Sequence, residues 1–123
     1  AAVVAKPIIN WLSKVLTGDS YLYQTYHQFP GAPWENVEHY WQRSPLSLVG
    51  NVKTPVMLMT GEEDRRTPIS ESEQFYQALK LRKIDTVMVR IPGSPHGISN
   101  KPSRMIGKVE YSLAWFAKYR TQD

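Results

Sequence analysis

Hydrophobic residues along this chain form short runs and helical stripes, which together predict alternating strands and helices. Residues 56–59 are an uninterrupted apolar run, which is typical of a strand buried on both faces of a parallel sheet. Residues 86–91 alternate between apolar and other positions, which favours a strand nearer the edge of the sheet. Residues 1–5 form a third, shorter apolar run. We therefore expect three strands, with the middle run of the sequence as the central one.

Two stretches with apolar residues three and four positions apart predict helices. In the first, Pro68 suits an opening helical turn, Ser70 and Glu73 have the spacing of a capping box, and an apolar face runs to about Leu81. In the second, Pro102 opens a helix with a stripe of the kind that faces a protein core. That stripe contains Ile106, Val109, Leu113 and Phe116, widened by Trp115 and Ala117. The resulting order of elements implies an α/β fold with a mainly parallel sheet and flanking helices.

The stretch between the first two strands has no clean periodicity. Residues 21–41 are rich in Tyr and Trp, and Pro30, Gly31 and Pro33 divide them into two short helical pieces at best. Two interpretations stay open for these aromatic residues: packing of a small excursion over the sheet, or direct contact with a substrate. Residues 44–46 and 51–55 are expected to form an extended entry to the central strand.

Composition narrows the classes of function. The chain has 123 residues, which is one domain by length, and a net charge of +4. Its densest basic group, Lys80, Arg82 and Lys83, lies at a predicted helix end, where cations complement the helix dipole, so no nucleic-acid partner is expected. The absence of Cys excludes disulfide and thiolate chemistry. No apolar run approaches the length of a membrane span, no signal peptide opens the chain, and nothing decides the compartment.

Two candidate catalytic residues follow successive strands. Gly61 frees the backbone after the central strand, and Asp64 comes next in a Glu-Glu-Asp turn; His96 follows the third strand within Pro-Gly-Ser-Pro-His-Gly. Open parallel sheets place their chemistry at the carboxyl ends of the strands. Each residue alone could be a solvated loop residue. Together, an acid followed by a histidine is the second half of a Ser-Asp-His relay in the order of α/β-hydrolases.

The nucleophile of such a relay is not evident. It should lie in a G-x-S-x-G elbow, but residues 93–97 have Pro in the third place, and Leu22 stands where the last glycine after Ser20 belongs. Metal binding is not indicated either, because His27, Glu38 and His39 lack the spacing of a ligand set. No glycine-rich phosphate loop is present. We therefore expect no metal and no cofactor.

The motifs around these residues give the chain a family resemblance. Ser-Pro-Leu at 44–46, the run from Thr54 to Pro68, the helix with Ser-Glu-Gln-Phe-Tyr-Gln-Ala-Leu-Lys, and Ile-Pro-Gly-Ser-Pro-His-Gly resemble the C-terminal part of a prolyl-oligopeptidase-family serine peptidase. The acylaminoacyl-peptidase and dipeptidyl-peptidase-like branch is the most similar. The resemblance implies that residues 1–123 are part of an α/β-hydrolase catalytic domain, its last three strands and C-terminal helix. The nucleophile half and any β-propeller would lie upstream, outside this chain.

The same resemblance implies roles for single residues. His96 and Asp64 would be the triad histidine and aspartate, Arg66 would reach a substrate carbonyl, and Ile8 and Trp11 would line the pocket for the residue before the scissile bond. The substrate would be a short peptide or acyl-peptide, cleaved through an acyl-enzyme. A carboxylesterase of the same fold and a catalytically silent interaction domain are the alternatives. The 123 residues alone are expected to be inactive and to self-associate through the exposed first strand.

Overall fold

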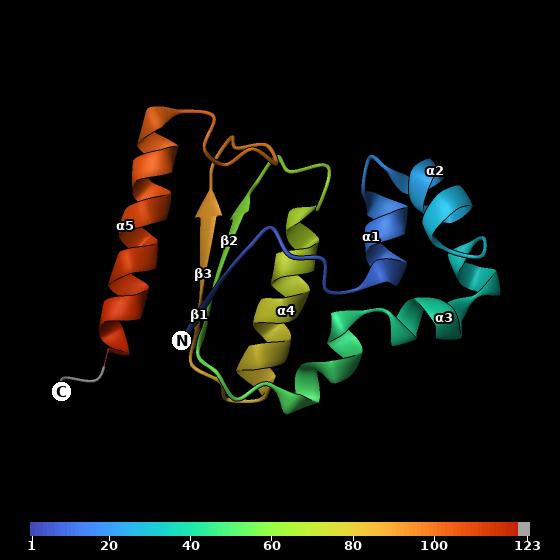
Figure 1. Cartoon of the computed structure of the whole chain (residues 1–123), viewed down its shortest axis with the longest axis horizontal. Helices are drawn as coiled ribbons and strands as arrows, with labels where there is room; N and C mark the ends of the chain where they lie inside the picture. The colour runs from blue at the N-terminus through green and yellow to red at the C-terminus, as the bar shows by residue number, and fades with distance from the viewer. Residues whose placement is uncertain (121–123) are drawn as a thin grey trace.

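Three parallel strands form the sheet, as the apolar runs predict. In the computed structural model, which describes residues 1–120, they are β1 (Ala2–Ala5), β2 (Val56–Gly61) and β3 (Thr86–Ile91), in the order β1-β2-β3. Every residue of β2 is buried, and β3 lies at the edge of the sheet. Because all three strands run in one direction, their carboxyl ends meet at one edge, at the top of Figure 1. The loops that carry Asp64 and His96 both leave from this edge.

Two long helices sandwich the sheet. Helix α4 (Ile69–Leu81) covers one face and α5 (Pro102–Lys118) the other (Figure 1). The side chains of β2 alternate between them: Leu58 packs with Leu79 of α4, whereas Met57 and Met59 pack with Trp115 of α5. A strand buried on both faces needs apolar residues at every position, which explains the uninterrupted run in the sequence.

The excursion between β1 and β2 is a small helical layer beyond α4 (Figure 1). It comprises α1 (Trp11–Thr17), α2 (Tyr21–Tyr23), the π-helical turn η1 (Gln24–Gln28), the 3-10 turn η2 (Pro33–Glu35), α3 (Val37–Gln42) and the 3-10 helix η3 (Pro45–Asn51). Its core is Val15, Phe29 and Tyr40, with the Phe29 and Tyr40 rings stacked at 3.9 Å. Phe29 and Tyr40 therefore pack in a core of the excursion itself, whereas Tyr21, Tyr23, Tyr26, Trp34 and Trp41 are exposed.

Two local expectations are wrong. Of the residues expected to be extended, 45, 46 and 51 belong to the 3-10 helix η3, because Pro45 stands at its first position and the N–H of Ser47 donates to the carbonyl of Ser44 at 3.0 Å, whereas 52–55 are not helical. The capping box is also absent: Pro68 is the N-cap residue of α4 and no side chain caps the helix. Glu73 lies further inside α4 and pairs instead with Arg90 of β3 at 2.6 Å.

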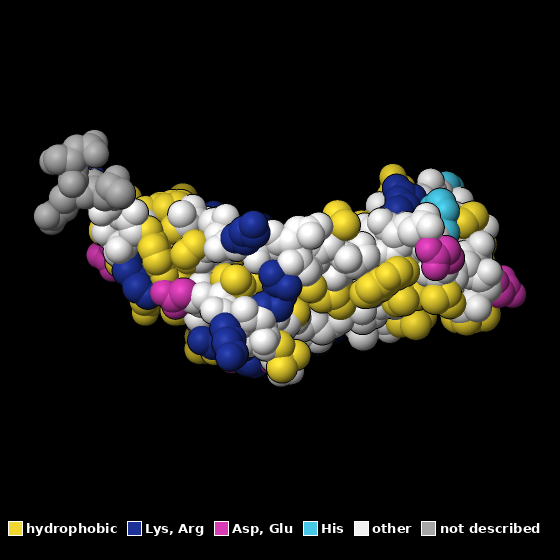
Figure 2. Space-filling view, turned by 90° about the horizontal axis from the view of Figure 1, so that it is seen from below, with side chains coloured by type: hydrophobic (Ala, Val, Ile, Leu, Met, Phe, Trp, Pro, Cys, Tyr) yellow, Lys and Arg dark blue, Asp and Glu magenta, His cyan; other side chains and the backbone are white. Residues whose placement is uncertain are grey.

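The apolar stripe of α5 lies on the surface, which contradicts the sequence prediction. Helix α5 is rotated so that Trp115 is buried against the sheet, while the predicted stripe is between 47% (Phe116) and 64% (Leu113) exposed. Trp115 packs with Met57 and Met59 of the sheet, and the ring of Tyr119 lies against the indole at 5.0 Å. Hydrophobic side chains consequently reach the surface at both ends of the molecule, over α5 and over the excursion (Figure 2). Among the described residues, no helix has the length and hydropathy to cross a membrane.

Candidate active site

Asp64 is held rigidly in the turn that follows β2. Its Oδ1 accepts the backbone N–H groups of Arg66 at 2.9 Å and Thr67 at 2.8 Å. Its side chain has no exposed area. A carboxylate bound to the backbone of its own turn is the standard local structure of an aspartate two or three residues before its donors. The second oxygen, Oδ2, has side-chain partners, one of them from a distant loop.

His96 contacts the second carboxylate oxygen of Asp64. Its Nδ1 lies 2.8 Å from Oδ2 of Asp64, across 32 residues of sequence. The imidazole is 42% exposed, and in residues 1–120 its Nε2 has no hydrogen-bond partner. An Nδ1–H that donates to a buried carboxylate fixes the tautomer in which Nε2 carries a lone pair. The pair can therefore present an oriented proton acceptor at the surface.

Thr67 is a third member of this cluster that the sequence analysis missed. Its Oγ1 lies 3.1 Å from Oδ2 of Asp64 and 3.2 Å from Nδ1 of His96. The hydroxyl can donate to the carboxylate and accept from the imidazole at once. A hydroxyl residue three positions after an aspartate is a known local hydrogen-bonding pattern, and this spacing was the available signal.

Gly61 brings the two loops together by lacking a side chain. A Cβ at this position would meet the backbone of Ser94 and lie 2.9 Å from the carbonyl oxygen of Pro95. The N–H of Glu63 donates to the carbonyl of Ser94 at 3.0 Å across the same gap. The backbone at Gly61 has ordinary strand geometry, so the expected need for backbone freedom at this position is wrong. Close approach, and not conformational freedom, is what this position requires.

Arg66 reaches away from His96 toward the excursion. Its Nε lies 2.7 Å from Oδ1 of Asp19, which stands in the turn after α1, and both side chains are about half exposed. The hydrogen bond from Arg66 lowers the pKa of the Asp19 carboxyl, and the reciprocal bond raises the pKa of the guanidinium. The structure thus joins the Asp64 turn to the excursion through an ion pair that nothing in the local sequence indicates.

Ile8 and Trp11 have different neighbours. Ile8 lines an apolar hollow of about 450 Å³ whose walls include Val4, Leu48 and Phe75. The Trp11 ring packs edge-on against Phe29 at 5.1 Å, in the core of the excursion. The residue set around each of them includes neither Asp64 nor His96.

A buried glutamate fastens the segment that carries these two residues to α4. Glu71 is fully buried, and its Oε2 accepts the N–H groups of Ile9 at 3.0 Å and Asn10 at 2.9 Å. Its Oε1 accepts the hydroxyl of Ser13 at 2.5 Å and the side-chain amide of Gln74 at 3.3 Å. The contacts with Ile9, Asn10 and Ser13 span about 60 positions of sequence. Glu71 therefore fixes the start of α1 relative to the helix that follows the Asp64 turn.

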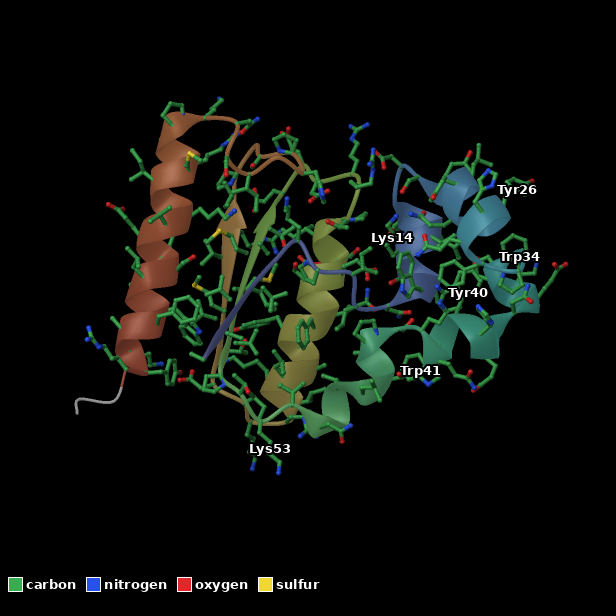
Figure 3. All side chains as sticks on the ribbon, viewed as in Figure 1. Lys14, Tyr26, Trp34, Tyr40, Trp41 and Lys53 are labelled. Carbon is green, nitrogen blue, oxygen red and sulfur yellow. The ribbon has the colours of Figure 1, made fainter. Side chains whose placement is uncertain are left out.

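A buried lysine of α1 also lies between α1 and α4. Lys14 is 1% exposed and lies on the side of α1 that faces α4 (Figure 3). Its Nζ donates to Oγ of Ser20 at 2.8 Å. Burial is the main cause that lowers the pKa of this lysine, and the nearby Asp19 carboxylate opposes the shift. Ser20 is thereby held in the turn of the excursion and has no contact with the imidazole.

The described part of the chain supplies neither a serine hydroxyl bonded to His96 nor a metal site. Thr67 is the only hydroxyl residue that bonds the imidazole in residues 1–120. The ring of His27 lies tilted against Tyr23, and the ring of His39 packs edge-on against Phe29. No group of three or more metal-binding side chains gathers anywhere in that range. The site is therefore a histidine–aspartate pair whose part-exposed imidazole can accept a proton.

Sequence comparison assigns the whole chain to one set of relatives. Residues 1–123 match the prolyl oligopeptidase family. The chain is 36% identical over 121 residues to the uncharacterized peptidase YuxL of Bacillus subtilis, covering 97% of this chain and 18% of that protein. It is 33% identical over 110 residues to the acylamino-acid-releasing enzyme of Mus musculus, covering 80% of this chain and 14% of the enzyme.

Structural comparison points to the same group. The acylaminoacyl peptidase of Pyrococcus horikoshii superposes with a TM-score of 0.86 at 28% sequence identity, covering 94% of this chain and 20% of that structure. The similarity thus includes nearly all of the sheet, the helices and the excursion. The chain spans about a fifth of the length of the relatives that it matches.

Proposed function

Because this chain belongs to the prolyl oligopeptidase family, we propose that it carries the histidine and the aspartate of a serine-peptidase triad. His96 is the general base and then the general acid, and Asp64 orients it. The observation that carries this proposal is the 2.8 Å contact between a fully buried carboxylate and a half-exposed imidazole. The expected family and the α/β-hydrolase fold class are both confirmed by the relatives and by the parallel sheet.

The geometry supports a defined sequence of proton transfers. The Nδ1–H of His96 donates to Asp64, so that Nε2 can accept the proton of a serine hydroxyl as that oxygen attacks the substrate carbonyl. The carboxylate then stabilises the imidazolium. His96 returns the proton to the leaving amine, which completes the acyl-enzyme step, and repeats the cycle with water. Thr67 holds both partners in register through its hydroxyl.

The nucleophile and its oxyanion donors, in this proposal, come from a part of the protein outside residues 1–123. Residues 1–123 form the last three strands and the C-terminal helix of the catalytic domain. Support comes from the lack of a serine hydroxyl bonded to His96 in residues 1–120 and from the fifth of the relatives' length that the chain spans. Without a nucleophile His96 has nothing to activate, so the 123-residue chain alone is inactive.

The proposed substrates are short peptides or acyl-peptides. The names of the relatives, acylamino-acid-releasing enzyme and acylaminoacyl peptidase, support this class. Arg66 then binds a carbonyl oxygen of the acyl group, and Ile8 and Trp11 form part of the pocket for the residue before the scissile bond. Glu71 supports that pocket by fixing the adjoining segment.

The test uses the full-length protein with matched peptide-amide and ester substrates. His96→Ala and Asp64→Asn are each expected to lower kcat by about three to four orders of magnitude, because triad members act as a unit. His39→Ala, an exposed histidine of α3, is the matched control and should leave kcat unchanged. A folded His96→Ala protein that keeps more than about a tenth of the activity refutes the proposal. Turnover of the ester alone would assign a carboxylesterase, and turnover of neither a silent interaction domain.

A further inference from the structure

The ion pair between Arg66 and Asp19 is built into the backbone of two loops. The N–H of Arg66 is bound to Asp64, so the guanidinium starts from a fixed point next to the catalytic pair. The N–H of Asp19 donates to the carbonyl of Arg65 at 2.8 Å, so the carboxylate starts from a fixed point as well. Two anchored backbones make this pair more specific than two free surface side chains would be.

The turn that carries Asp19 is pressed against the Asp64 loop. A Cβ at Gly18 would lie 2.9 Å from the carbonyl oxygen of Lys14 and 3.2 Å from that of Arg66, so only glycine fits without a shift. On the other side of the turn, Ser20 accepts the buried ammonium of Lys14. The turn is therefore held from both sides, and this fixes the position of Asp19 relative to Arg66.

Two carboxylates compensate the charge of Arg66, Asp19 most strongly and Asp64 to a smaller extent. Asp19 also interacts favourably with Lys14, whose pKa is lowered by burial and also by the nearby Arg66 guanidinium. Asp19 binds only Nε of the guanidinium, and neither Nη group of Arg66 has a hydrogen-bond partner within residues 1–120. Arg66 thus keeps two N–H-bearing groups for a ligand while its charge is compensated by a neighbour.

We propose that Asp19 is a specificity-determining residue, which makes Arg66 bind an uncharged acyl carbonyl oxygen in preference to a carboxylate. This inference rests on the substrate role proposed above for Arg66. A guanidinium that is paired with a carboxylate still donates hydrogen bonds to a carbonyl oxygen. It offers a second carboxylate little net attraction to offset that carboxylate's loss of hydration. Substrates with an uncharged N-blocking group, such as acetyl, are then favoured over those with an acidic one, such as succinyl.

The experiment measures equilibrium binding of N-acetyl- and N-succinyl-phenylalanine amide to the full-length protein by titration calorimetry. Asp19→Asn keeps an oxygen acceptor for Arg66 and removes the charge. We expect the affinity for the succinyl ligand, relative to the acetyl ligand, to rise about threefold at low salt and to return toward the wild-type ratio at high salt. Glu35→Gln, which removes one exposed acid of the same excursion, is the control for net charge and should not change the ratio.

Arg66→Met separates this mechanism from a general effect of the turn. In the Asp19→Asn/Arg66→Met double variant the shift in ratio should disappear, because no guanidinium remains to be unmasked. An unchanged ratio in Asp19→Asn, an equal shift without Arg66, or binding of neither ligand overturns the inference. The outcome is independent of His96, since binding equilibrium needs no catalysis, so failure here and failure of the proposed triad are told apart.

Discussion

Replacing Gly61 by alanine should separate His96 from Asp64 without changing either residue. A Cβ at this position would lie 2.7 Å from the carbonyl carbon of Ser94, against the 3.4 Å at which ordinary contact begins. The obstructing atoms are backbone, which cannot rotate away as a side chain can. The loop that carries His96 must therefore move away from β2 by at least about 0.7 Å.

That displacement is comparable to the lengthening that the hydrogen bond between His96 and Asp64 can tolerate. His96 Nδ1 and Asp64 Oδ2 are 2.8 Å apart, so a shift of this size along their line stretches the contact to the limit of about 3.5 Å. A misplacement near 1 Å costs a catalytic group about a hundredfold in rate. We expect kcat of the full-length protein to fall about a hundredfold, with a loss of about 1–3 kcal/mol in the free energy of unfolding from the overpacking.

Gly97 provides the matched control. It lies in the same loop, one residue from His96, but a Cβ there would have no atom within 4 Å. Gly97→Ala should therefore retain wild-type kcat and melting temperature. The assay is steady-state hydrolysis of an N-blocked peptide substrate, together with thermal unfolding of each variant. A Gly61→Ala protein with kcat within about threefold of wild type would show that the two loops do not depend on close approach.

Three further predictions concern stability and assembly. Glu71→Ala should cost about 3 kcal/mol in chemical denaturation, because the buried N–H of Ile9 and the partly buried N–H of Asn10 lose their acceptor. Glu73→Ala, at an exposed ion pair, should cost less than about 1 kcal/mol, and equal losses would contradict the network. Lys14 has a lowered pKa in the fold, so between that pKa and the unfolded value of 10.5 the unfolded chain binds more protons and wild-type stability rises with pH. Lys14→Met should therefore gain more relative stability at pH 7 than at pH 10, and equal gains would refute the shift. The 123-residue chain should self-associate in light scattering through the unpaired outer edge of β1, and a dilution-stable monomer would count against this.

The sequence by itself predicted the strands and the order of the two catalytic candidates. The continuous apolar run of β2 and the alternation of β3 are local signals, and each reports how many faces of a strand are covered. Asp64 and His96 could be placed at one edge because consecutive parallel strands end at the same edge. Pro102 began α5 as predicted, since proline at a first helical position needs no tertiary support.

Tertiary structure decided the features that depend on which surfaces meet. The stripe of α5 has the right period, but the burial of Trp115 determines the rotation of the helix and leaves that stripe exposed. Thr67, Glu71 and the Asp19–Arg66 pair acquire partners 29 to 62 positions away. Periodicity and turn chemistry are properties of neighbouring residues, whereas these contacts require the loops of separate strands to be packed at one edge. Only the folded chain brings them within hydrogen-bonding distance.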